Sequence, residues 1–88
     1  MSVRYTPRSL QDLENIRRTI SKDNPSAAWI VASFIRRTIR NLEHWSYQGR
    51  ATEKENVRRL AVSTFPYVVY YLVRADQVVV LNTRPCRS

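Results

Sequence analysis

The spacing of apolar residues predicts two helices early in the chain. Residues 7–22 follow Thr6 and begin with Pro7, which suit the N-cap and the first position of a helix. Their apolar side chains recur three and four residues apart, as on one face of a helix. Residues 25–45 repeat this pattern behind an Asn-Pro pair. The short polar connection SKDN then indicates an antiparallel helical hairpin.

The second predicted helix has an unusually wide apolar face. Trp29, Ile30 and Phe34 extend its stripe over more than half of the helix surface. Such a helix lies either between two layers of structure or partly exposed toward a partner. We expect the first arrangement, with the helix between two layers.

The later part of the chain has the composition of strands. Residues 57–62, 67–74 and 77–82 are rich in Val, Tyr and Leu, and residues 2–6 alternate as in a short strand. The order β-α-α-β-β-β predicts an α+β fold in which a helical hairpin packs on a small, mainly antiparallel sheet. We expect one domain over residues 1–88.

Composition narrows the possible functions. No apolar run approaches the ~20 residues of a membrane span, and the first ten residues lack the apolar region of a secretion signal. We therefore expect a cytoplasmic protein without a membrane partner. One histidine, His44, and one cysteine, Cys86, do not fit a zinc site, so we expect no metal and no cofactor. His44 is interpreted as a helix-end cation and Cys86 as incidental.

The charge points to an anionic partner. The chain carries 15 basic and 7 acidic side chains, a net charge of +8, and nearly all the basic residues are arginines. Arginine presents a planar fork that matches phosphate and carboxylate groups. The partner class is nucleic acid or an acidic protein, unless the arginines are simply solvated cations. Basic residues are spread evenly, so folding has to assemble any anion site.

A candidate site lies on the predicted sheet. Arg58 and Arg59 are neighbours on one strand and therefore point to opposite faces. One of them would share the helix-free face with other arginines and with Tyr70 or Tyr71. Such a cationic and aromatic groove would hold phosphate and stack bases. The alternative is an ordinary solvated sheet face.

The whole pattern resembles the RelE/ParE superfamily of bacterial type II toxins. The segments that carry the resemblance are YTPRSLQDLENI, DNPSAAWIVASFI, QGR, VRRL and YVVYYLVRADQVVVL. No single segment is specific, but all five occur in register through nearly the whole chain. The resemblance implies a toxin that an acidic antitoxin neutralises within a hetero-oligomer.

The superfamily divides into two functions. RelE-like members are ribosome-dependent mRNA endoribonucleases, and ParE-like members inhibit DNA gyrase without cutting RNA. In a nuclease, Lys54 and Arg58 would supply cations. Asn82 and Pro85 stand where nuclease members carry an arginine and a proton donor, so the ParE-like branch and a non-enzymatic gyrase inhibitor are favoured. The ribosome-dependent nuclease and a non-toxic nucleic-acid-binding module remain alternatives.

The resemblance and the charges together suggest two sets of contact residues. The cations expected to bind the cellular target are Arg50, Arg58, Arg84 and Arg87. The residues expected to bind the antitoxin are Trp29, Phe34, Arg36, Arg37, Arg40 and Tyr71. No residue is assigned a catalytic role outside the nuclease alternative.

Overall fold

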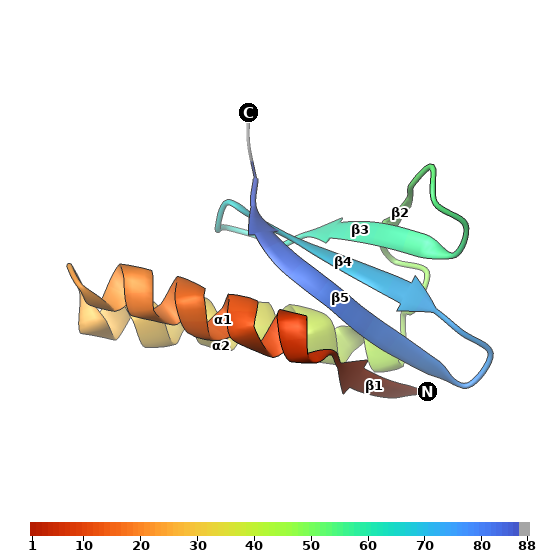
Figure 1. Ribbon diagram of the computed structural model, residues 1–88, viewed down its shortest axis with the longest axis horizontal. Coiled ribbons are helices and arrows are strands. Elements are labelled where there is room, and N and C mark those ends of the chain that lie inside the picture. Colours follow the sequence, from red (N-terminus) through yellow and green to blue (C-terminus); the bar gives the residue numbers. More distant parts are fainter. Residues whose placement is uncertain (87–88) are drawn as a thin grey trace.

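Two helices pack side by side against one face of a five-stranded sheet (Figure 1). The structure, a computed structural model, describes residues 1–86. The elements in chain order are β1 (Ser2–Tyr5), α1 (Pro7–Ser21), α2 (Pro25–Arg40), a 3-10 turn (Asn41–Glu43), β2 (Arg50–Ala51), β3 (Val57–Ala61), β4 (Tyr67–Val73) and β5 (Gln77–Pro85). The α+β fold predicted from the sequence is confirmed.

The sheet has the strand order β1-β5-β4-β3-β2. β1 runs parallel to β5, and the other neighbouring strands are antiparallel. The mainly antiparallel sheet is therefore as predicted. β2 was not predicted, because a strand of two residues in a polar loop has too few side chains to show an alternating pattern.

Both helices begin at the predicted caps. The Ser9 N–H donates to Thr6 Oγ1 at 3.1 Å, and the Ala27 N–H donates to Asn24 Oδ1 at 3.1 Å. A proline follows each cap. The Thr6 hydroxyl also donates to the Val80 carbonyl at 2.9 Å, so the cap of α1 is tied to β5 as well.

The hydrophobic core lies between the helices and the sheet. Its completely buried side chains come from both layers, because α2 and the inward positions of β4 and β5 bury their apolar stripes against each other. They include Ile35, Ile39, Leu42, Val69, Tyr71, Val78 and Val80.

The expectation that α2 lies between two layers is wrong. Both helices belong to a single layer, so one side of α2 faces outward (Figure 1). Trp29 is 64% exposed and Ile30 is 53% exposed. The apolar stripe also ends earlier than predicted: Leu42 is buried, but Trp45 is 68% exposed because the helix has already ended at Arg40.

A β-bulge sets the direction of the last side chains of β5. Tyr70 pairs with Asn82 but Tyr71 pairs with Val80, so Leu81 is an extra residue in β5. Val80 faces the core before the bulge, and Thr83 is buried on the same side after it. The bulge therefore turns Asn82 to the face that the helices leave open, and Arg84 follows by alternation.

Neither of the described helices combines the length and the hydropathy that a bilayer span requires.

Candidate functional site

A row of polar side chains crosses the open face of the sheet, the face opposite the helices. Arg50 of β2 pairs with Arg59 of β3, Arg59 pairs with Tyr70 of β4, and Tyr70 pairs with Asn82 of β5. Directly paired residues of neighbouring strands lie on the same face. The fold thus gathers four residues from four strands into one line.

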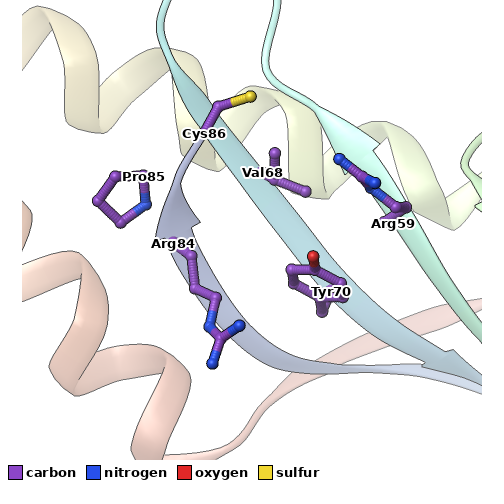
Figure 2. Close-up of a pocket in the computed structure, with 6 residues that line it drawn as sticks. All are labelled: Arg59, Val68, Tyr70, Arg84, Pro85 and Cys86. Atoms are coloured by element: carbon purple, nitrogen blue, oxygen red, sulfur yellow. The ribbon is translucent and has the colours of Figure 1, made fainter. Parts of the chain in front are cut away.

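Arg84 completes a cationic groove beside this row. Its guanidinium carbon lies 5.9 Å from the centre of the Tyr70 ring. A hollow of about 550 Å³ runs along the face, and Figure 2 shows Tyr70 between Arg59 and Arg84 in it. The hollow is lined by Arg59, Val68, Tyr70, Arg84, Pro85 and Cys86.

A second hollow of about 310 Å³ adjoins the first, because Tyr70 and Arg84 line both. It adds Lys54 from the loop before β3, together with Glu53 and Asn82. The Asn82 side-chain oxygen is buried there without a hydrogen-bond partner in the described chain. We call the two hollows and the row beside them the cationic face; its cations are Arg50, Lys54, Arg59 and Arg84.

The cations of this face form no ion pairs with carboxylates of the described residues, although Glu53 lines the second hollow beside Lys54. Among residues 1–86, the ion pairs join Arg8 to Asp12 and join Arg17 and Arg18 to Glu14, all on α1. Several unpaired guanidinium groups on one surface produce a positive potential that attracts an extended anion. The arrangement can bind and orient such an anion.

Arg58, which the sequence assigned to target binding, does not lie on this face. It pairs with the buried Tyr71 and points to the inner side of the sheet. Its Nη1 donates to the Gly49 carbonyl at 2.7 Å, and its guanidinium lies 4.8 Å from the centre of the Tyr47 ring. Arg58 holds the loop before β2, whereas Arg59 is the arginine on the open face.

The expectation that Tyr71 binds the antitoxin is corrected. Its exposed fraction is 0%, so it cannot contact an antitoxin. Its hydroxyl accepts a hydrogen bond from the Gly49 N–H at 2.8 Å. Burial raises the pKa of Tyr71, although the Gly49 hydrogen bond and the charge of Arg58 lower it. Tyr70, its neighbour, is the tyrosine of the groove.

Gly49 permits this packing. A Cβ atom at this position would lie 2.7 Å from the Arg59 carbonyl oxygen and 2.7 Å from the Tyr71 hydroxyl. The glycine thus allows a close approach between the loop and the sheet.

Comparison with known proteins identifies the family. The family model described as the ParE toxin of the type II toxin–antitoxin system parDE matches residues 3–87. The chain belongs to the ParE toxin family. The predicted resemblance to the RelE/ParE superfamily, on its ParE-like branch, is confirmed.

Two individual matches agree with this assignment. The toxin is 31% identical over 74 residues to a curated relative, "Putative toxin Y4kP" of Sinorhizobium fredii, covering 84% of this chain and 77% of the relative. Its fold is similar to that of a chain in the solved structure "Chromosomal ParDE TA system from P. aeruginosa". That match has a TM-score of 0.90 and 22% identity, and covers 99% of this chain and 97% of the other.

The remaining target-binding candidates fall in different places. Arg50 and Arg84 are exposed on the cationic face, as a target-binding role requires. Arg87 lies outside the described residues. Lys54 and Arg58, the cations of the nuclease alternative, are not brought together, because Lys54 lines the open face and Arg58 is held on the inner side.

The other single residues have ordinary surroundings. His44 is exposed at the end of the 3-10 turn, and Cys86 is exposed at the rim of the groove. Within residues 1–86, no group of three or more His, Cys, Asp or Glu side chains could hold a metal ion.

The antitoxin candidates other than Tyr71 lie in the helical layer. Trp29 projects from α2 beneath the guanidinium of Arg17, which is 5.3 Å from the ring centre. Phe34 is half-buried and packs edge-on against Phe65, with the two ring centres 5.1 Å apart. Arg36, Arg37 and Arg40 are exposed on α2. The ParE-family toxin therefore presents two chemically different surfaces, one cationic on the sheet and one apolar and cationic on α2.

Arg59 and Tyr70 were not assigned to the site by the sequence. Alternation along β3 and β4 showed that one residue of each adjacent pair had to face outward. It could not show which one, because that depends on the pairing of the strands and on the face that the helices cover.

Proposed function

We propose that this toxin arrests growth by binding DNA gyrase in the cytoplasm, with the cationic face as its target-binding surface. The observation that carries the proposal is the set of unpaired arginines Arg50, Arg59 and Arg84 around Tyr70. Membership of the ParE family supports gyrase as the target.

The geometry favours binding over RNA cleavage. Cleavage through a 2′-hydroxyl requires groups that accept and donate protons beside cations that stabilise the developing charge. Lys54 and Arg58 lie on different sides of the sheet. At the rim of the groove stands Pro85, which has no proton to donate, and arginine is always protonated at neutral pH. Glu53, Lys54 and Tyr70 of the second hollow are therefore the groups left for proton transfer in the nuclease alternative.

A supercoiling assay with purified gyrase tests this function. Excess wild-type toxin should inhibit the supercoiling of relaxed plasmid. In the presence of the same amount of Arg59→Ala/Arg84→Ala, most of the supercoiling activity should remain. Arg18→Ala/Lys22→Ala removes the same charge from the distant end of α1 and should inhibit like the wild type. Normal supercoiling in the presence of excess folded toxin would exclude gyrase as the target. Codon-positioned cleavage of translated mRNA would instead indicate the ribosome-dependent nuclease.

We further propose that a cognate acidic antitoxin covers the exposed side of α2. Trp29 and Ile30 supply apolar anchors, and Arg36, Arg37 and Arg40 supply charges for its carboxylates. Trp29→Ala should weaken antitoxin binding at least tenfold in calorimetry and leave gyrase inhibition unchanged. Unchanged antitoxin affinity would place the antitoxin elsewhere.

A further inference from the structure

We infer that the cationic face binds the phosphate backbone of duplex DNA directly, so that the toxin contacts the DNA that gyrase holds. This inference rests on the proposed function, since gyrase is what brings the toxin to a DNA duplex. It adds a nucleic-acid ligand for the same surface.

The first reason is that the large exposed hydrophobic residues lie elsewhere, although Val57, Val68 and Leu81 line the hollows at partly or fully buried positions. Protein interfaces are centred on buried aromatic or aliphatic anchors. The large exposed hydrophobic residues of the described chain do not line either hollow of the cationic face. They are Met1, Leu10, Trp29, Ile30, Trp45 and Tyr47. Charge therefore contributes much of the recognition at this face, and a phosphate backbone held beside gyrase supplies the matching charge.

The second reason is the type and spacing of the cations. Arg59 on β3 and Arg84 on β5 are separated by β4, which places their strands about 10 Å apart (two strand spacings). Along one strand of a duplex, phosphates follow one another every ~3.4 Å of helix axis. The two forks can thus reach phosphates a few nucleotides apart, with Arg50 and Lys54 flanking them.

The third reason concerns the single aromatic ring. Surfaces that bind single strands stack successive bases on several aromatic side chains. Here Tyr70 is the aromatic residue that lines the hollows, it is half-buried, and Arg84 lies against its ring (Figure 2). The face is therefore suited to a backbone whose bases remain paired, as in a duplex.

The expected affinity is low and depends strongly on salt. Contacts from three to four cations give a slope of log K against log salt of about −3, and non-specific binding of this kind has a Kd of about 10⁻⁴ to 10⁻⁶ M. Weak binding is sufficient in a complex, because gyrase holds the DNA at a high effective concentration beside the toxin.

Fluorescence anisotropy with a labelled DNA duplex tests the inference on the free toxin over a range of salt concentrations. The wild type should give a slope of about −3, and Arg59→Ala/Arg84→Ala should reduce its magnitude by about 2. Arg18→Ala/Lys22→Ala is the charge-matched control and should keep the wild-type slope. Thermal melting of each variant confirms that it is folded.

Three results would overturn the inference. The first is a slope of log K against log salt near zero for the wild type. The second is an equal reduction of this slope in Arg59→Ala/Arg84→Ala and in its control. The third is tighter binding of the wild type to polyglutamate, single-stranded DNA or duplex RNA than to duplex DNA. If Arg59→Ala/Arg84→Ala loses duplex binding but still inhibits gyrase, a role for the DNA contact in inhibition is rejected and gyrase remains the proposed target. If the wild-type toxin binds the duplex but does not inhibit gyrase, the target is rejected and the DNA contact is not.

Discussion

The Asp12 carboxylate accepts a hydrogen bond from the backbone N–H of Thr83 at 3.0 Å, and so joins α1 to the last strand. β1 ends at Tyr5, opposite Val80, so the following part of β5 has no strand beside it on that edge. Asp12 accepts from the N–H that this edge would otherwise leave unpaired, and Pro85, two residues further, has no N–H to offer. Together they protect this edge from pairing with another strand.

Asp12→Ala should lower the free energy of unfolding by about 1–3 kcal/mol, because it leaves the buried-side N–H of Thr83 without an acceptor. Chemical denaturation measures the change. Asp23→Ala removes the same charge from an exposed position and should change stability by less than about 0.5 kcal/mol. Equal effects of the two substitutions would show that the contact contributes nothing beyond charge.

Tyr71→Phe should destabilise the fold by about 1–3 kcal/mol at pH 7, because the Gly49 N–H loses its acceptor. It should also change the alkaline limb of the stability profile. The folded-state pKa of Tyr71 is raised, so its contribution is complete below the ordinary value near 10 and is lost as the pH rises through the raised value.

The variant should therefore lose stability less steeply than the wild type above pH ~10. Some alkaline loss should remain, because burial also raises the pKa of Tyr5. Denaturation curves at several pH values measure both slopes. Identical slopes for the variant and the wild type would contradict the assignment to Tyr71.

Gly49→Ala should lower the free energy of unfolding by about 1–3 kcal/mol, the usual cost of overpacking. The added methyl group would meet the Arg59 carbonyl oxygen and the Tyr71 hydroxyl, both at 2.7 Å. Gln48→Ala, the exposed neighbour, is the control and should have little effect. A neutral Gly49→Ala would mean that the loop moves away from the sheet without cost.

Arg58→Ala and Arg59→Ala should have opposite consequences. Arg58→Ala removes the bond to the Gly49 carbonyl and the contact with Tyr47, and should cost about 1–2 kcal/mol of stability. Arg59→Ala should leave stability nearly unchanged but reduce growth arrest after induced expression. Melting temperatures and growth curves separate these effects. Full arrest by Arg59→Ala, with arrest lost in a stable Arg58→Ala protein, would reverse the two assignments.

Much of the fold could be predicted from local patterns. Thr6 and Asn24 cap their helices because their side-chain oxygens reach the N–H groups three residues later, an interaction that depends only on nearby sequence. The helical hairpin and the closing strands could also be predicted from nearby residues, and the resemblance to the family rests on short segments of the sequence. The excess of arginine also indicated an anionic partner.

The composition of the site was decided by the tertiary structure. Strand alternation has a period of two, so a shift of one residue exchanges every inward and outward side chain. Sequence could therefore not choose between Arg58 and Arg59, or between Tyr70 and Tyr71. Strand pairing and the face covered by the helices made that choice.

The bulge at Leu81 shows the same division. Simple alternation along β5 would place Asn82 and Arg84 on the same side as Val78 and Val80, in the core. The extra residue turns Asn82 and Arg84 outward and buries Thr83 instead. The sequence by itself determined the two helices, the strands other than β2 and the charge, because these follow from local patterns and composition; only the pairing of distant strands decided which charges meet on one face.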